Sequence, residues 1–235
     1  MERAGGLEDP AWKFRKLALL EGDVDPKRQI HGFNTGTVCG VRDGEAVRPL
    51  FGYDVFSSIR LIPQSDGTIM RLNRELIFYR DLETGRILDT WNNVYTGETV
   101  RVVDVANDPY NYFITPQGVQ TSRNHIHANP VARAERWFTA NENTVGFERD
   151  VHLLYPSKLR PEQWPRESPG PMTRVSEFMR YFIRVEDLEN DSLTHLPHNG
   201  TWVRVTPWLP WMLMDQAPGH IVYVGMFSTR RDTSG

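Results

Sequence analysis

The sequence predicts a mainly β protein, a single antiparallel β-barrel of calycin-like type with an N-terminal helix and a few short helices. Three observations support this fold class. At least eight segments have the β-branched and aromatic composition, or the alternation, that is typical of strands. Few segments have helical spacing, and neither strand–helix–strand alternation nor an internal repeat is visible. A large antiparallel sheet is stabilised by closure, because closure removes its exposed edges.

The size and charge of the chain favour one domain that handles a small molecule. The chain has 235 residues, of which 39% are hydrophobic, and no low-complexity linker divides it. We expect a single domain over residues 1–235, with residues 1–28 as a helical arm and residues 156–173 as a Pro-rich loop or lid. The net charge of -3 comes from interspersed charges, so neither nucleic acid nor an anionic membrane is an expected partner.

Cysteine content and the N-terminus bear on the cellular compartment. Cys39 is the only cysteine, so we expect neither a disulfide framework nor a thiolate metal cluster. A lone cysteine in an apolar strand is more often a small buried hydrophobe than a nucleophile. The first ten residues have no signal-peptide core, and no apolar run approaches the length of a membrane span. We therefore expect an intracellular, cytoplasmic protein.

The first elements along the chain are a helix and two strands. The helix is predicted over residues 9–21, because Asp9 suits the N-cap and Pro10 suits the first helical position. Residues 31–41 and 49–63 then have strand composition, and a polar turn separates them.

The stretch from Thr68 to Val105 is predicted to be a meander of three strands joined by two turns that each contain glycine. Alternation in its first strand defines two faces. One face is largely apolar and contains Met70, Leu72, Arg74, Leu76 and Phe78. The other mixes apolar groups with charge, amide and phenol, and contains Ile69, Arg71, Asn73, Glu75, Ile77 and Tyr79. This second face either meets water or lines a polar cavity.

The last two strands of the meander suggest a pair of carboxylates. If Thr96 and Gly97 form a two-residue turn, Trp91 faces Val102, and Asp89 faces Asp104. Like charges directly opposite are unfavourable unless one carboxyl keeps its proton or a cation lies between them. Such a pair would serve as a general acid; the other interpretation is that the register differs or the strand ends diverge.

The second half of the chain continues the strand pattern. Residues 144–155 alternate, with Arg149 on the apolar side and His152 on the polar side. Residues 132–138 and 175–185 fit either a helix or a strand. The remaining expectations are one helical turn at 185–188, strands at 201–206 and 220–227, and a short buried helix or a hydrophobic loop at 207–215.

Polar residues that alternate along strands of an otherwise apolar barrel are the candidate catalytic groups. We assign proton handling and anion orientation to Arg71, Glu75 and His220. The alternative for the strand that holds the first two is a solvated outer face. The C-terminal tryptophans are either core or the apolar wall of a pocket. The expected substrate-binding residues are Asn73, Tyr79, Trp91, Arg204, Trp208 and Trp211.

Three histidines give a metal site as an alternative. His125, His127 and His152 with a nearby carboxylate would suit zinc or iron. The His-x-His spacing resembles that of cupins, but the glycine and glutamate that accompany it there are not at matching positions. Isolated histidines are more often structural groups held by hydrogen bonds.

Motifs for nucleotides and for common hydrolases are missing from the sequence. We find no phosphate-binding glycine loop, no G-x-G-x-x-G after a strand, no G-x-S-x-G and no paired C-x-x-C. We therefore expect no organic cofactor and no serine-hydrolase mechanism.

Two long runs resemble the domain-of-unknown-function family 1838. They are RELIFYRDLETGRILDTWNNVYTGETVRVVDVANDPYNY and GTWVRVTPWLPWMLMDQAPGHIVY. Shorter stretches near Thr37 and Pro49 fit the family as well, and the similarity extends from about Phe33 to Phe227. The resemblance implies one domain, but it implies no reaction and no catalytic residues.

These observations predict an enzyme without an organic cofactor. It would carry out acid-base chemistry of the lyase, isomerase or cyclase type on a small, largely apolar aromatic or terpenoid metabolite, as enzymes of secondary metabolism do. The first alternative is a lipocalin-like binding protein that needs the same pocket but no titrating group. The second is a metal enzyme that uses histidine and carboxylate ligands. A homodimer is left open.

Overall fold

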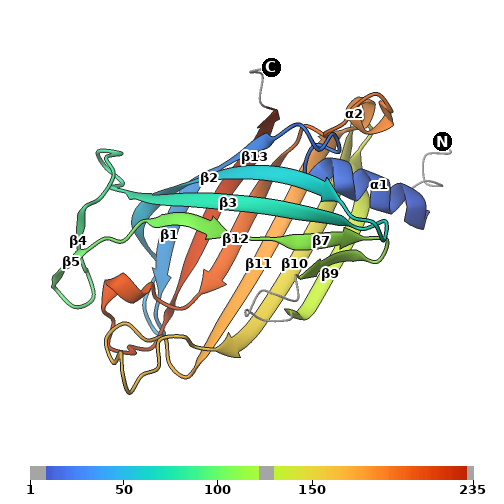
Figure 1. Ribbon diagram of the computed structural model, residues 1–235. Helices are drawn as coiled ribbons and strands as arrows, with labels where there is room; N and C mark the ends of the chain where they lie inside the picture. Colours follow the sequence, from blue (N-terminus) through green and yellow to red (C-terminus); the bar gives the residue numbers. More distant parts are fainter. Residues whose placement is uncertain (1–8, 122–129, 232–235) are drawn as a thin grey trace.

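The computed structural model describes residues 9–121 and 130–231, and in them one antiparallel sheet curls into a nearly closed barrel (Figure 1). The predicted mainly β barrel with an N-terminal helix is confirmed. The strands of the described chain are β1 (Ile30–Val41), β2 (Arg48–Pro63), β3 (Ile69–Arg80), β4 (Thr90–Asn92), β5 (Thr99–Arg101), β6 (Val105–Pro109), β7 (Tyr112–Thr115), β8 (Gly118–Thr121), β9 (Pro130–Asn141), β10 (Thr144–Pro156), β11 (Met172–Arg184), β12 (Asn199–Thr206) and β13 (His220–Arg231). The helices are α1 (Pro10–Glu21), α2 (Val185–Glu189) and the 3-10 turn η1 (Pro210–Met212).

The topology is an antiparallel meander in which the last strand, β13, pairs with the first strand, β1. The strand order is β8-β7-β3-β2-β1-β13-β12-β11-β10-β9, and β6 pairs with β3 beside β7. The first and last strands pair along their whole length, from Ile30 opposite Arg231 to Val41 opposite His220. The order ends at β8 and β9, where the guanidinium of Arg133 donates to the backbone oxygen of Val119. Closure therefore combines backbone pairing at β1–β13 with a side-chain contact at β8–β9.

The structure decides the open assignments and corrects the meander. Residues 132–138 and 175–185 are both strands, within β9 and β11, and the segment 207–215 contains the short helix η1. The predicted meander is wrong after β3. The strands β4 and β5 leave the barrel and form a separate two-stranded sheet.

The register of that hairpin also differs from the predicted one. Trp91 lies opposite Val100. The reason is a longer connection: the amide of Asn93 donates to the Glu98 oxygen at 2.8 Å, and four residues bridge them. The amide of Val102 donates to the Asp89 oxygen at 3.0 Å, so Asp89 and Asp104 do not form the proposed carboxylate pair.

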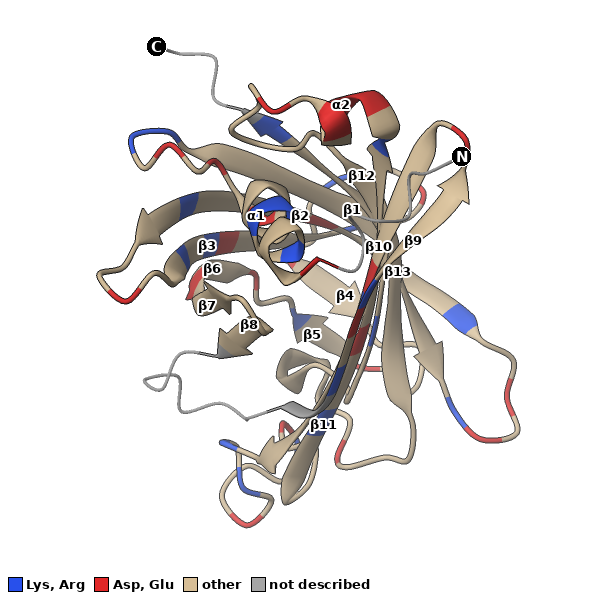
Figure 2. Ribbon diagram, turned by 90° about the vertical axis from the view of Figure 1, so that its right-hand side faces the viewer, with Lys and Arg blue, Asp and Glu red and all other residues tan. Residues whose placement is uncertain are grey.

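Helix α1 closes one end of the barrel. Its start is as predicted, with the amide of Ala11 donating to the Asp9 carboxylate at 3.0 Å and Pro10 in the first turn. Its last turns are buried, because the apolar residues Leu17 to Leu20 enter the barrel. The backbone oxygen of Leu19 accepts from the amide of Leu196 at 2.8 Å, which ties the helix to the loop before β12. Figure 2, seen from this end, shows α1 lying between β2 and β10.

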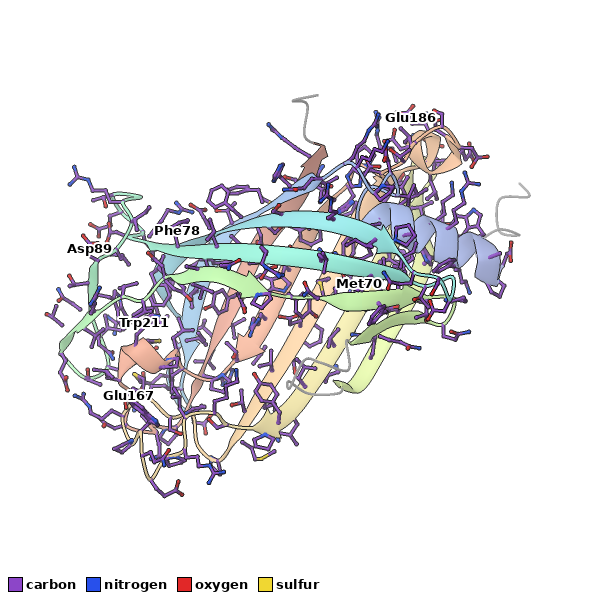
Figure 3. All side chains as sticks on the ribbon, in the orientation of Figure 1. Met70, Phe78, Asp89, Glu167, Glu186 and Trp211 are labelled. Carbon is purple, nitrogen blue, oxygen red and sulfur yellow. The ribbon has the colours of Figure 1, made fainter. Side chains whose placement is uncertain are left out.

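An aromatic cluster closes the opposite end. The ring of Phe51 lies 5.3 Å from the rings of Tyr79 and Trp211 and 5.4 Å from that of Trp91. These side chains come from β2, β3, β4 and η1, so the hairpin and the loop after β12 pack as one plug. Figure 3 shows Trp211 and Asp89 at this end and Glu186 at the other. None of the helices described is long and apolar enough to cross a membrane.

Candidate binding cavity

A cavity of about 230 Å³ lies inside the barrel, between the α1 end and the aromatic plug. Its walls are residues of β1 to β3 and β6 to β8 on one side and of β9 to β13 on the other, with the end of α1 above them. An apolar cavity of about 150 Å³ holds benzene, so this space is large enough for a small organic ligand. It is smaller than the pockets of about 300–1,000 Å³ that hold drug-sized molecules.

The polar face of β3 forms part of the cavity wall. Arg71 and Asn73 are buried, at 8% and 1% exposure, and Glu75 lines the same space. The opposite face of the strand is outside, where Leu76 is 42% exposed and packs beside Phe56 of β2. The largely apolar face is thus the one that meets solvent. The charged face is the one that looks inward.

A buried cluster of charges lies where α1 enters the barrel. The carboxylate of Glu21 lies 2.5 Å from Nη1 of Arg149 and 3.3 Å from Nε of Arg71, and it accepts a hydrogen bond from the hydroxyl of Tyr112. Arg149 also donates from Nε to Glu135 at 2.7 Å. Burial raises the pKa of Glu21, but the charges of Arg149 and Arg71 outweigh it and hold this pKa below its ordinary value. Glu21 is therefore an ionised carboxylate between two guanidinium groups.

Several buried polar atoms of this region have no hydrogen-bond partner among the residues described. They are Nη1 of Arg71, Nη2 of Arg149, Nε of Arg133, Oδ1 of Asn73 and Oε1 of Glu21, the last of which is within ion-pair distance of Arg149. Nearly all buried polar groups in folded proteins find a partner, so unsatisfied atoms in a cavity wall call for an explanation. A bound ligand that accepts hydrogen bonds from the arginines would supply one.

The pKa of Glu75 is shifted in the opposite direction to that of Glu21. Oε1 of Glu75 accepts a hydrogen bond from Asn73 Nδ2 at 2.7 Å. Burial raises the pKa of Glu75, and the nearby carboxylates of Glu177 and Asp108 raise it further, against the opposing effects of Asn73 and Arg71. Two carboxyl groups of one lumen thus have pKa values shifted in opposite directions.

The wall opposite β3 contributes an ion pair and an aromatic surface. Arg204 of β12 donates to Glu177 of β11 at 2.9 Å. Trp202 lines the cavity, and its ring lies 5.5 Å from that of Tyr223 and 5.7 Å from that of Tyr53. A ligand therefore meets charge on one part of this wall and an aromatic face on the other.

One histidine faces the cavity as a neutral acceptor. Nδ1 of His198 lies 2.9 Å from the backbone oxygen of Leu196, which can only accept, so the proton is on Nδ1 and Nε2 is free to accept. Burial lowers the pKa of His198 to about 4. The neighbouring His195 uses both ring nitrogens within the fold, with Nε2 at 3.1 Å from the Thr229 hydroxyl.

The structure brings together four of the site residues predicted from the sequence. These cavity residues are Arg71, Asn73, Glu75 and Arg204. The other predicted residues lie apart from the cavity lining. His220 begins β13 opposite Val41. The remaining four pack in the aromatic plug and are Tyr79, Trp91, Trp208 and Trp211.

The alternative metal ligands are not gathered in the described structure. His125 and His127 lie outside the described residues. His152 is on the outer side of β10, where its Nδ1 is 3.0 Å from the Ser176 hydroxyl and its ring packs on Phe178. Within residues 9–121 and 130–231, no group of three or more His, Cys, Asp or Glu side chains could hold a metal ion.

Sequence reasoning missed several residues of the cavity. They are Glu21, Tyr110, Tyr112, Arg133, Glu177 and His198. Arg149 could have been found, because it is a charged residue on the apolar side of an alternating strand, between Phe147 and Val151. A charge at such a position is either paired or functional.

The comparisons with known proteins identify a family and no activity. A family model described as "Protein of unknown function (DUF1838)" matches residues 29–232. No curated protein matches the chain. A solved structure, "Crystal structure of MucB in complex with MucA(peri)", aligns with 94% of this chain and 98% of that one, at 11% identity and a TM-score of 0.15. A score so low carries no argument about the fold.

Proposed function

Because the chain belongs to the DUF1838 family, whose description states no activity, we propose its function from the cavity. The protein is an enzyme without an organic cofactor that moves protons on a small, largely apolar metabolite. The observation that carries this proposal is Glu75, a carboxyl group in the wall of an internal cavity, held at one oxygen by Asn73. Burial raises the pKa of this carboxyl toward the range in which a general acid works.

The reaction classes that fit are isomerisation and elimination. In an isomerisation, Glu75 gives its proton to one substrate atom and takes another proton from a second atom, so the enzyme returns to its starting state. In an elimination of water, Glu75 protonates the departing hydroxyl and then removes the proton from the neighbouring carbon. Neither reaction needs an oxidant or a second substrate, and Arg71 and Arg204 are placed to hold the polar groups of the ligand.

The dimensions of the cavity favour an aromatic substrate over a large terpenoid. A space of about 230 Å³ exceeds the volume that binds benzene by about half. One ring with a short polar substituent fits, and Trp202 offers a ring surface for stacking.

The test compares turnover by matched variants on a mixture of metabolites. Wild type, Glu75→Gln and Glu148→Gln are incubated with a small-molecule extract, and mass spectrometry follows the composition over time. Glu148 is the control because it lies on the outer face of the barrel, paired with Arg136 at 2.8 Å. We expect a compound that wild type and Glu148→Gln convert with no change of mass or with loss of water. Conversion by Glu75→Gln should be about 10²–10⁴-fold slower, as for loss of a general acid. Full conversion by Glu75→Gln would remove the proposed acid.

The alternative function is storage or transport of a small molecule, as in lipocalins. An up-and-down barrel with a cavity in its lumen and packed elements at both ends supports it. The same experiment separates the two functions. A compound that all three proteins retain unchanged over long incubation would favour binding without catalysis.

A further inference from the structure

We propose that the α1 end of the cavity is a carboxylate-binding subsite formed by Arg71, Arg133 and Arg149. The inference rests on the proposed function in taking a small molecule as the occupant. It adds the chemical class of that molecule, an aromatic carboxylic acid bound as its anion.

The first support is a set of donors without acceptors. Arg71 and Arg149 are 8% and 4% exposed, yet each has one terminal nitrogen without a hydrogen-bond partner. Nε of Arg133 is also buried and unpaired among the described residues. Leaving a buried donor unsatisfied is destabilising, and more so for a charged group. The two oxygens of a carboxylate match guanidinium geometry and would satisfy these donors together.

The second support is the charge balance. Three guanidinium groups lie in this part of the lumen, and the carboxylates bound to them are those of Glu21 and Glu135. Arg133 has no ion pair among the described residues, although Asp108 and Glu177 also line the cavity and Glu177 is paired with Arg204. Buried charge is normally compensated, and a ligand with a single negative charge would complete the set.

The strand register brings Arg133 beside the other two arginines. On β9 and β10, Arg133 lies opposite Val151 and Glu135 lies opposite Arg149, so Arg133 and Arg149 are diagonal neighbours on the inner face. Tyr110 lines the same cavity, where desolvation and Glu177 raise the pKa of its hydroxyl and the charges of Arg149, Arg133 and Arg71 all lower it. The arginines thus share one region although they come from three strands.

The geometry also gives the ligand an orientation. Arg71 and Glu75 are four residues apart on one face of β3, so their Cα atoms are separated by about 13 Å. A carboxylate at the arginines leaves the rest of the ligand lying toward Glu75. There the wall includes the apolar side chains of Val55, Ile77 and Trp202 beside the carboxyl groups of Asp108 and Glu177. The acid group is therefore the anchor, and the reacting atoms lie several bonds away from it.

A single negative charge distinguishes a carboxylate from a phosphate ester. A phosphate carries about two negative charges at neutral pH. Two charges would exceed the single positive charge of Arg133, the guanidinium that has no ion pair among the described residues here. We therefore expect a phosphate analogue to bind more weakly than the carboxylate.

The experiment measures probe binding by calorimetry at low ionic strength. The probes are 4-phenylbutanoate, its neutral amide and 4-phenylbutyl phosphate. Wild type should bind the carboxylate at least tenfold more tightly than the amide. Arg133→Gln should reduce this preference to less than threefold. Arg136→Gln should retain it, because Arg136 is on the same strand but its side chain is 68% exposed and faces outward to Glu148.

Three results would each refute the proposed subsite. Wild type could bind the carboxylate and the amide with equal affinity, or it could fail to bind the carboxylate. Arg133→Gln could also retain the tenfold preference for the carboxylate over the amide. Tightest binding of the phosphate would overturn the choice of carboxylate. Affinity is read without turnover, so the subsite can fail while Glu75-dependent conversion persists. Conversely, full activity of Glu75→Gln would refute the proposed acid and leave the affinity preference intact.

Discussion

At the scale of single residues, the cavity is defined by two glutamates in opposite protonation environments. Glu21 has its charge balanced by Arg71 and Arg149, whereas Glu75 has an amide partner and lies near further carboxylates. Environments that push two carboxyl pKa values apart are how a site keeps one group as an anion and another as an acid. Because of this contrast, we assign the role of general acid to Glu75 and the role of structural counter-ion to Glu21.

The raised pKa of Glu75 predicts a pH-dependent stability change in Glu75→Gln. A folded state that holds the proton more tightly than the unfolded state loses stability as the pH rises from the unfolded pKa through the folded one. Glutamine does not titrate. We therefore expect the stability of Glu75→Gln to increase relative to that of wild type as the pH rises above about 4.5. A gain of 1 kcal/mol corresponds to a Tm increase of about 2–4 °C. Thermal unfolding between pH 4 and 8 measures it.

Glu162→Gln is the control for that pH series, because Glu162 is exposed in the loop between β10 and β11. Its Tm difference from wild type should stay constant across the range. A Glu75→Gln protein that loses stability relative to wild type as the pH rises would contradict the raised pKa.

The inner face of β3 shows what a single sequence can and cannot reveal about a site. Alternation groups Arg71, Asn73 and Glu75 correctly, because side-chain period follows from strand geometry alone. Which face is internal depends on partners that are distant in the chain. Glu21 lies 50 residues from Arg71 and 91 from Tyr112. Local patterns contain no information about such pairs.

At the scale of elements, α1 supplies both an apolar plug and a charge. The family match begins at residue 29, so the helix that carries Glu21 lies outside the matched region while both arginines lie inside it. The helix therefore contributes a counter-ion to the matched barrel. Without that carboxylate, two buried guanidinium groups would face each other across the lumen.

We predict that Glu21→Gln is strongly destabilising. Removing one member of a buried ion pair leaves uncompensated charge and costs about 3–5 kcal/mol, which lowers the Tm by roughly 10 °C. The measurement is denaturant unfolding at pH 7. Because the pKa of Glu21 is lowered, its contribution is fully present above the ordinary pKa of 4.5 and disappears as the pH falls through the folded value. The difference in the free energy of unfolding between wild type and Glu21→Gln should therefore become smaller at acidic pH.

Glu186→Gln is the matched control for Glu21→Gln. Glu186 lies 2.5 Å from Arg184, but both side chains are about two-thirds exposed, at 67% and 69%. Exposed ion pairs contribute about 0–1 kcal/mol. Equal losses in the two variants would show that Glu21 is no more important than a surface charge.

The hairpin of β4 and β5 shows why element boundaries were harder to predict than element types. Both strands were expected, and both are present. The error came from assuming a two-residue turn at Thr96-Gly97, whereas Asn93 organises a longer loop by accepting the Tyr95 amide with its side chain at 2.9 Å. A side-chain hydrogen bond of this kind moves the register by two residues. It also removes the Asp89–Asp104 pair.

At the scale of the whole molecule, the meander closes where the first strand meets the last. Within each half, most neighbouring strands follow one another along the chain, and the sequence predicted the antiparallel barrel without the order of its strands. The pairing of β1 with β13 joins segments almost two hundred residues apart along the chain, roughly as in other up-and-down barrels. Gly36 and Gly225 face each other in this seam. Their close approach is a feature that only the assembled barrel makes visible.

This seam predicts different outcomes for two glycine substitutions in adjacent strands. A Cβ at Gly36 would lie 2.1 Å from the backbone oxygen of Val224 and 2.6 Å from Cα of Gly225. Backbone atoms within a sheet cannot move aside alone, so we expect Gly36→Ala to lose about 2 kcal/mol or more, at the upper part of the range for overpacking. A Cβ at Gly52 would meet its nearest atoms at 3.5 and 3.6 Å, an ordinary contact. Gly52→Ala should therefore stay within about 1 kcal/mol of wild type, since alanine also restricts the unfolded chain.

Urea unfolding of both variants at one pH provides the comparison. An unchanged denaturant slope with a lower midpoint for Gly36→Ala would show a loss of stability without a change in the compactness of either state. Neither glycine has a left-handed backbone conformation. The difference in stability between the two variants therefore reflects the room available for the added Cβ atom. Equal midpoints for the two variants would mean that β1 and β13 can separate at no cost. In that case the seam would be the flexible part of the barrel, and the pairing from Ile30 to Val41 would not be what keeps the cavity closed.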